Sequence, residues 1–151
     1  MRVVIQRVSK ASVQVDSNLI SSISEGLLIL LGIENNDTND DINWLIKKIA
    51  NLRIFSDKND KMNYSVMDIN GDIIVVSQFT LHAKTKKGNR PSYINAAKPE
   101  IAIPLYQKFI NDLSLETGSS VYSGEFGADM QVTLTNDGPV TIIIDSKNKD
   151  L

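Results

Sequence analysis

The run Leu27–Ile33 constrains the fold more than any other segment of the chain. It is apolar throughout, with no polar residue alternating along it, and a strand of this kind is buried on both faces. A second strand, Ile73–Phe79, is apolar up to Val76 and follows the hairpin signal Asn70-Gly71. Both runs are far shorter than the roughly 20 residues that cross a bilayer. We therefore expect a buried sheet and no membrane partner.

Two further segments repeat apolar residues at helical spacing. The first follows a capping residue, Asp37 or Thr38, and has its apolar positions between Ile42 and Ile49. The second is expected from near Ile103 to Leu115, with Pro104 in its first turn. Other strands are expected at residues 2–8, 11–15, 19–24, 53–55, 121–122, 130–135 and 140–145. This order predicts one mixed α/β domain over residues 1–151, with a frayed polar tail at 146–151.

The composition excludes several kinds of site. The chain has no cysteine and a single histidine, His82, so thiolate sites and multi-histidine metal sites are impossible within one chain. No glycine-rich nucleotide-binding motif follows any strand. We expect no metal and no cofactor. With no leader or membrane segment evident, a cytoplasmic location is expected.

The charge is distributed unevenly along the chain. The net charge is −2, yet residues 73–99 contain no acid and carry five cations, so the remainder is at −7. Four of these cations lie together in the segment 83–91: Lys84, Lys86, Lys87 and Arg90. A basic segment in an acidic protein indicates either a local nucleic-acid contact or a solvated loop without a partner.

Two short segments have the polar or backbone character of a site. The cluster Ser77-Gln78-Phe79-Thr80 ends an apolar strand just before the basic segment; such residues can act in catalysis or merely terminate the strand. On an extended strand, Thr80 and His82 would stand about 6–7 Å apart, which favours a surface or packing role for His82 over a catalytic base. The dipeptide Gly138-Pro139 could form a cis peptide that lets a backbone approach closely, or an ordinary turn.

Several ordered segments together resemble the D-aminoacyl-tRNA deacylases. The match covers about residues 1 to 145 and is carried by the segments 77–81 (SQFTL), 87–93 (KGNRPSY), 126–132 (FGADMQV) and 136–141 (NDGPVT). Tyr93 stands where phenylalanine is common, and residues 84–87 are more basic than expected. The resemblance implies a three-layer α/β domain of mixed sheets with a barrel-like core and two main helices. It also implies a homodimer.

The resemblance assigns roles to particular residues. In such a dimer, Ser77, Gln78, Phe79 and Thr80 of one subunit would form the catalytic motif and would receive Gly138 and Pro139 from the other. Arg7 matches the position that holds this dipeptide, and Phe126 and Met130 would line the pocket. Main-chain N–H groups near Gln78–Thr80 would stabilise the oxyanion. Thr80 has no base to activate it, so the tRNA 2′-OH is the alternative catalytic group.

The implied substrates are tRNAs carrying a D-amino acid or glycine. A rigid backbone filter would reject the Cβ of an L-amino acid, whereas glycine has no Cβ and would pass. Lys84, Lys86, Lys87 and Arg90 would hold the acceptor-stem phosphates, and DNA is not expected as a partner. The alternatives are a Thr- or Ser-dependent hydrolase of small esters, an RNA-binding scaffold without activity, and a relative specialised for glycyl-tRNA or another misacylated tRNA.

Overall fold

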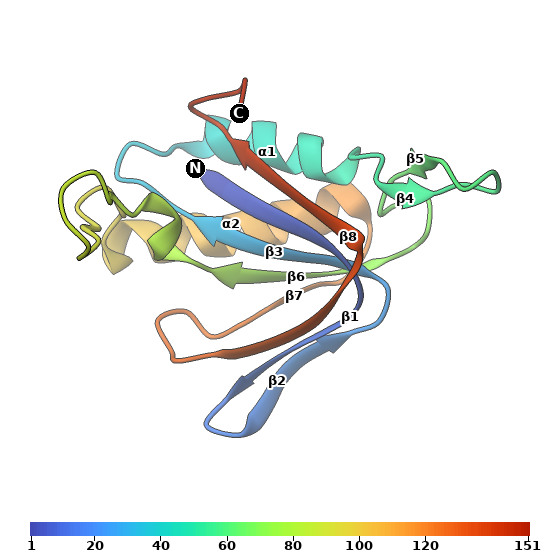
Figure 1. Ribbon diagram of the computed structural model, residues 1–151, viewed down its shortest axis with the longest axis horizontal. Coiled ribbons are helices and arrows are strands. Elements are labelled where there is room, and N and C mark those ends of the chain that lie inside the picture. Colours follow the sequence, from blue (N-terminus) through green and yellow to red (C-terminus); the bar gives the residue numbers. More distant parts are fainter.

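A single curled sheet with two helices on one face forms the molecule (Figure 1). The computed structural model describes residues 1–151. The elements in chain order are β1 (Arg2–Val15), β2 (Asn18–Ile23), β3 (Gly26–Gly32), α1 (Asn39–Ala50), β4 (Phe55–Ser56), β5 (Met62–Tyr64), β6 (Asp72–Ser77), the 3-10 helix η1 (Phe79–His82), α2 (Pro99–Thr117), β7 (Val121–Ser123) and β8 (Gln131–Asp145). Strands β4 and β5 form a separate two-stranded hairpin.

The long strand β1 organises the six-stranded sheet. Along one edge it pairs antiparallel with β3 through residues 2–8 and then with β2 through residues 11–15. Along its other edge it pairs with β8 over most of its length. Strand β6 lies parallel to β3, and β7 lies parallel to β6. Because β1 changes partner midway, its two halves can bend relative to one another and the sheet curls.

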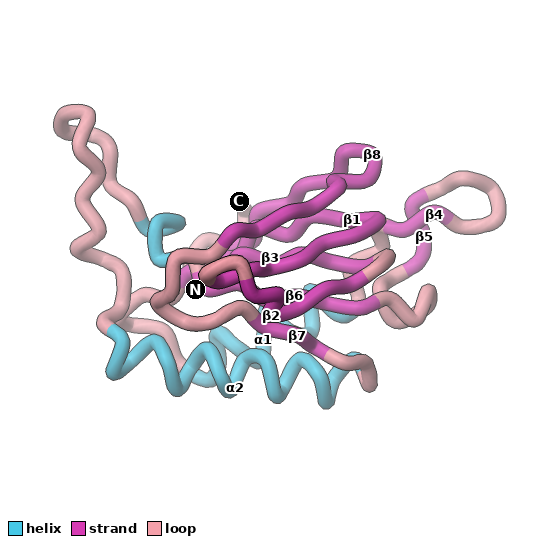
Figure 2. The backbone as a smooth tube through the Cα atoms, turned by 90° about the horizontal axis from the view of Figure 1, so that it is seen from below, coloured by secondary structure: helices cyan, strands magenta, loops and turns pink.

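Alternate residues of β3 and β6 face two different cores. Leu27 and Ile29 of β3 pack toward the helices, together with Ile73 and Val75 of β6. Leu28, with Ile74 and Val76 of β6, packs into a second core against the far halves of β1, β2 and β8. Figure 2 shows both helices on one side of the strands. The expected burial of Leu27–Ile33 on both faces is confirmed, as is a mixed α/β fold with a nearly closed, barrel-like sheet and two helices.

Helix α1 begins where the capping signal predicts. Thr38 is the N-cap, and its side chain accepts a hydrogen bond from the Asp40 N–H while Asp41 bonds back to the Thr38 backbone. This reciprocal pair satisfies donors that the first helical turn leaves free. The apolar stripe faces the core: Ile42, Leu45, Ile46 and Ile49 are buried.

Helix α2 begins earlier than the sequence pattern predicts. It starts at Pro99, which occupies the first helical position, and ends before Gly118, which takes a left-handed conformation with φ 67°. Pro104 therefore lies in the second turn, so the prediction that it would sit in the first turn is wrong. The overlooked signal is Pro99 followed by Glu100, because proline and an acid both favour the start of a helix.

Strands β1 and β8 are each continuous where the sequence predicts two strands. β1 runs through Ser9 and Lys10, and β8 runs through Asn136–Pro139. The register slips between Gln6 and Val8: Gln6 pairs with Thr141 and Val8 pairs with Asn136. The four residues 137–140 thus bulge out opposite Arg7 alone, which absorbs the glycine and proline without ending the strand.

The two ends of the chain are joined by a buried polar network. The Met1 ammonium group pairs with Asp37 and also donates to Ser146 Oγ. Ser146 Oγ donates to Asp41 at 2.6 Å, and Lys147 Nζ lies 2.8 Å from the same carboxylate. The tail expected to fray from residue 146 is therefore attached through its first two residues.

Candidate functional site

A cavity of about 290 Å³ opens at the carboxyl end of β6. Its walls come from the ends of β3 and β6, from the segment before β8, and from the start of α2. The lining residues are Leu31, Ile33, Val76, Ser77, Gln78, Phe79, Ala97, Ala102, Phe126, Gly127, Ala128, Asp129, Met130 and Val132. Ligands in sheets with parallel strands commonly bind at this end of the strands. The cavity is thus the leading candidate for a binding site.

The polar motif forms the turn that leaves β6 at the cavity. Strand β6 ends at Ser77, and the Gln78 N–H donates to Leu31 O at 2.8 Å. The chain then turns into η1 at Phe79, so the prediction that the strand extends to Phe79 is wrong. The N–H groups of Phe79 and Thr80 open this short helix, where the first N–H groups have no partner within the helix. They are therefore available to a ligand in the cavity.

Thr80 is hydrogen-bonded within the motif and not to a base. The side-chain amide of Gln78 donates to Thr80 Oγ1 at 2.5 Å. An amide nitrogen cannot take a proton from the hydroxyl at neutral pH, so this contact orients Thr80 without activating it.

His82 is a packing residue and faces away from that chemistry. Its side chain is buried, with Nδ1 3.2 Å from Glu34 Oε1, and its Nε2 has no partner. Its ring lies over Gly32, where an added Cβ would come within 3.0 Å of it. The 6–7 Å separation expected on a strand does not apply, because Thr80 and His82 lie on η1.

Aromatic packing fixes the opposite wall of the cavity. The Phe126 ring meets the Tyr106 ring edge to face at 5.6 Å. Tyr106 on α2 is anchored by its hydroxyl, which donates to Val75 O at 2.6 Å. Burial raises the pKa of Tyr106 to about 12, so the hydroxyl stays protonated and keeps this bond. Phe126 and Met130, predicted as pocket walls, both line the cavity.

Gly138 and Pro139 lie elsewhere in the subunit, on the exposed bulge of β8. Their peptide bond is cis, and Gly138 has φ 121°. Arg7 supports the bulge: its Nε donates to Asp137 O at 3.1 Å and lies 3.2 Å from Asp137 Oδ2, while its Nη1 donates to Ile54 O. A Cβ at Gly138 would come within 2.8 Å of Arg7 Nη2.

This bulge is well separated from the cavity of the same chain. Arg7 pairs with Leu27 of β3, whereas Ser77 pairs with Leu31. Four residues of strand correspond to about 13 Å along the sheet. The structure therefore brings together the motif and the pocket walls, but not the Gly138-Pro139 dipeptide.

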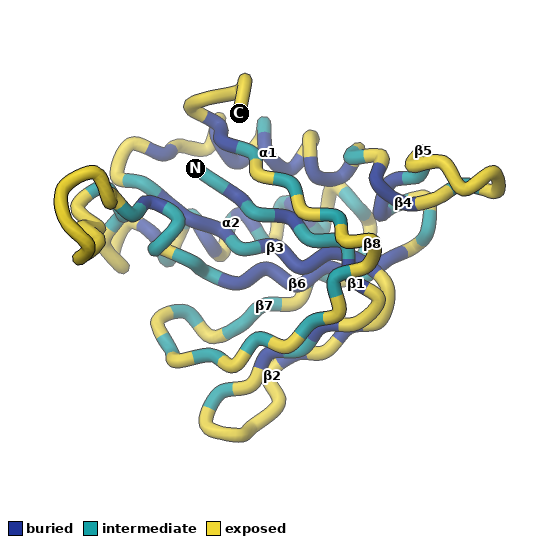
Figure 3. The backbone as a smooth tube through the Cα atoms, in the orientation of Figure 1, coloured by how far each residue is buried: buried dark blue, intermediate teal, exposed yellow.

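The basic segment projects as an exposed loop directly after η1. Lys84 and Ser92 exchange two backbone hydrogen bonds, at 2.8 and 3.0 Å, that close the loop at its base. Figure 3 shows the loop as an exposed arm at one end of the molecule. The cations Lys84, Lys86, Lys87 and Arg90 are all exposed on it. They lie beside the turn that carries Phe79 and Thr80.

Other kinds of site have little support in the structure. No cluster of three or more His, Cys, Asp or Glu side chains is placed to hold a metal ion. No helix has the length and apolar character needed to cross a membrane. The sequence pattern missed the cavity residues Ala97, Ala102 and Asp129. Their contribution comes from tertiary packing, and no local signal marks them.

The curled α/β sheet, the cavity and the polar turn beside a basic loop define an enzyme with its site at the end of β6. A family model described as D-Tyr-tRNA(Tyr) deacylase matches residues 4–145. The chain belongs to this family. The expected class, an aminoacyl-tRNA deacylase and thus a hydrolase, is confirmed by that membership.

Curated relatives match over nearly the whole chain. A protein of Flavobacterium psychrophilum is 69% identical over 99% of this chain and all of its own length. One of Bacteroides fragilis is 65% identical with the same coverage. Both are named D-aminoacyl-tRNA deacylase.

Two solved structures share the fold. One named c-Myc DNA Unwinding Element Binding Protein superposes with a TM-score of 0.90 at 42% identity, covering 96% of this chain and 98% of that one. A probable eukaryotic D-amino acid tRNA deacylase superposes with a TM-score of 0.81 at 16% identity, covering 95% of this chain and 97% of that one. The second likeness concerns the fold alone.

Proposed function

We propose that this protein hydrolyses the ester that joins a D-amino acid, or glycine, to tRNA. The observation that carries the proposal is the cavity bounded by Ser77, Gln78 and Phe79 on one side and by Phe126 and Met130 on the other. It belongs to a chain whose curated relatives bear the name D-aminoacyl-tRNA deacylase. The proposed location is the cytoplasm, where charged tRNA is used.

The chemistry rests on main-chain groups and on the substrate. As water attacks the ester carbonyl, negative charge develops on its oxygen, and the free N–H groups at the start of η1 would stabilise that charge. Each well-placed donor contributes about 3–4 kcal/mol. Thr80 contacts the Gln78 amide and no base, so the neighbouring ribose 2′-OH is the better candidate for moving the proton.

The proposed active site is completed by a second copy of the chain. Gly138 and Pro139 are exposed and lie about 13 Å along the sheet from the motif in the same subunit. In a homodimer, the bulge of one subunit would enter the cavity of the other. A closed twofold arrangement would supply two such sites at once.

Specificity would arise by exclusion. Backbone atoms of the bulge, held by Arg7, would stand where the Cβ of an L-amino acid has to go, and the Cβ of a D-amino acid would point away. Glycine lacks a Cβ, and a site of this kind cannot reject a smaller substrate sterically. Glycyl-tRNA, including mischarged tRNA(Ala), is therefore a proposed substrate.

The loop cations would contact the tRNA backbone. Lys84, Lys86, Lys87 and Arg90 lie exposed next to the cavity, and neutralising phosphates releases counterions, so binding should weaken steeply with salt. A small number of contacts at the acceptor end is compatible with a protein whose net charge is −2.

The test is hydrolysis of three substrates by the purified protein and its Thr80→Ala variant. We expect loss of D-tyrosyl-tRNA and glycyl-tRNA, survival of L-tyrosyl-tRNA, and substantial activity in the variant. Abolished activity in Thr80→Ala, with ready cleavage of a D-tyrosyl ester lacking RNA, would indicate a threonine-dependent small-ester hydrolase. Binding of tRNA without cleavage of any substrate would indicate a scaffold.

A further inference from the structure

An exposed aromatic pair stands at the mouth of the cavity. The side chain of Phe79 is 56% exposed and that of Tyr93, on the loop, is 39% exposed. Their rings meet edge to face, with centroids 5.0 Å apart and planes at 77°. Ile94 next to them is 75% exposed. Large apolar side chains that gather on a surface in this way commonly mark a binding site.

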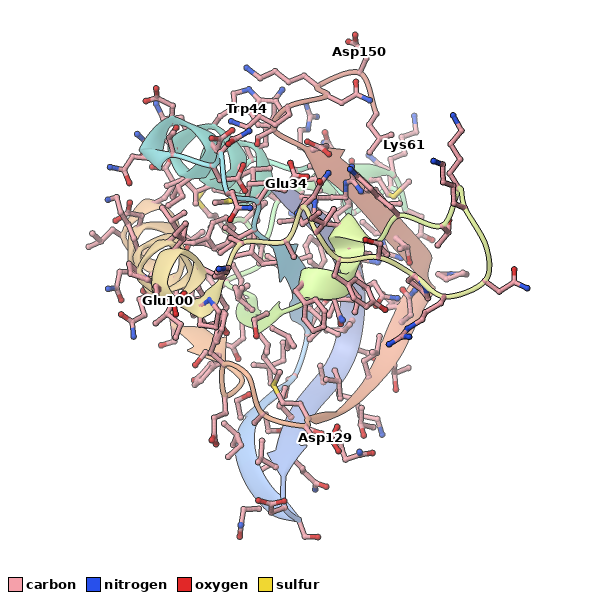
Figure 4. All side chains as sticks on the ribbon, turned by 90° about the vertical axis from the view of Figure 1, so that its left-hand side faces the viewer. Glu34, Trp44, Lys61, Glu100, Asp129 and Asp150 are labelled. Atoms are coloured by element: carbon pink, nitrogen blue, oxygen red, sulfur yellow. The ribbon has the colours of Figure 1, made fainter.

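The backbone holds this patch in place beside the cavity. The base of the loop is closed by the two hydrogen bonds between Lys84 and Ser92, and Ala97 N–H donates to Ile33 O at 2.9 Å. Glu34 and Ala96 form a further bridge to the segment after β3. Figure 4, which views the molecule from the side of the loop, shows Glu34 near its centre. Tyr93 and Ile94 thus lie between fixed points of the chain, one turn away from the motif.

The surroundings of the patch identify the chemistry of its ligand. Phe79 also lines the cavity, so the patch continues from the site that would take the aminoacyl group. The cations of the loop lie on its other side. Aromatic rings beside cations bind unpaired nucleotides, because bases stack on the rings while phosphates meet the positive charges.

We propose that Phe79, Tyr93 and Ile94 form a stacking platform for an unpaired nucleobase at the 3′ end of tRNA. This inference rests on the proposed function, since it assumes that the ester enters the cavity and leaves the adjoining nucleotides at its mouth. The platform would fix the end of the tRNA relative to η1. It would bind without reading sequence by itself, because every base has a face that can stack.

The test uses an uncharged RNA, so it requires no turnover. A hairpin copying the acceptor end, with 2-aminopurine in place of the terminal adenine, is titrated with protein while its fluorescence is followed. Wild type and Tyr93→Phe should quench the fluorescence on binding, because both offer a ring for stacking. Tyr93→Ala should quench little and bind about 5- to 100-fold more weakly, the range for loss of one stacking contact.

Tyr122 supplies the matched control. It is 40% exposed on β7, so Tyr122→Ala removes an equally exposed ring outside the patch and should bind and quench like wild type. Sedimentation checks the subunit state of each variant. Wild-type quenching and affinity in Tyr93→Ala would overturn the proposal, and so would a change in its subunit state, which would make the patch a contact between copies. Failure of the deacylase proposal would appear instead as bound RNA without ester hydrolysis.

Discussion

The sole histidine is satisfied on one ring nitrogen and not on the other. Nδ1 faces Glu34 at 3.2 Å, which selects the form with a proton on Nδ1, while the buried Nε2 has no partner. An unpaired buried polar atom costs about 1–3 kcal/mol. The free energy gained from the Glu34 contact is therefore largely offset at the same side chain.

This balance predicts unequal effects for the two partners. His82→Leu removes the contact and the unpaired nitrogen together, so the free energy of unfolding should change by less than about 1 kcal/mol. Glu34→Ala leaves both nitrogens unpaired and should cost about 1–3 kcal/mol. Urea denaturation at pH 7 measures both values. A greater loss in His82→Leu than in Glu34→Ala would contradict this account.

Single residues also show how far the site could be predicted from sequence. The motif and the pocket walls were predicted through family resemblance, and the structure gathers Ser77, Gln78, Phe79, Phe126 and Met130 around one cavity. Spacing alone misplaced Thr80 relative to His82, because it assumed an extended strand where the chain turns into η1. A turn at the end of a buried strand depends on tertiary contacts, such as Gln78 N–H to Leu31 O, which have no local signature.

Among the elements, α1 was the most predictable and β8 the least. The cap and apolar stripe of α1 are local features that act within a few residues. In β8, Gly138 and Pro139 look like the end of a strand, but pairing with β1 on both sides of the bulge keeps the strand continuous. The early start of α2 depends on one proline at a favoured position. Local rules therefore located the elements, whereas strand pairing decided which of them were joined.

Helix α1 carries a pH-dependent contribution to stability through Asp41. Burial raises its pKa, but hydrogen bonds from Lys147, Ser146 and the Thr38 N–H outweigh burial and hold the pKa well below its usual range. A lowered pKa in the folded state stabilises the protein above the unfolded-state pKa of about 3.9. That contribution is lost as the pH falls through the folded-state value.

We therefore expect Asp41→Asn to lower the free energy of unfolding by about 1–3 kcal/mol at pH 7. The difference from wild type should shrink as the pH falls below about 4. Urea denaturation at pH 7, 5 and 3.5 measures it. Asp40→Asn, an exposed acid in the same helical turn, is the control and should cost less. An Asp41→Asn effect that stays the same from pH 7 to 3.5 would show that the carboxylate charge is not responsible.

At the scale of the whole molecule, one chain has two halves of a site at opposite ends of its sheet. The cavity and the motif lie at the carboxyl end of β6, while the bulge with Gly138 lies beside Leu27 and Arg7. The strands between them are among the most buried in the protein. Bringing the halves together within one chain would require the core to come apart, whereas a second copy can supply the missing half without deformation.

Mixing two damaged variants distinguishes these arrangements. Gln78→Ala alters the motif, and Gly138→Ala forces a side chain against Arg7 at a φ of 121° that side chains rarely adopt, so each alone should lose most activity. In a dimer sharing its sites, a mixed pair combines an intact motif from one chain with an intact bulge from the other. Refolding the variants together at equal amounts should then restore about a quarter of wild-type sites. If each site were built within one chain, every site in the mixture would carry one lesion, and hydrolysis of D-tyrosyl-tRNA would stay at the level of the separate variants.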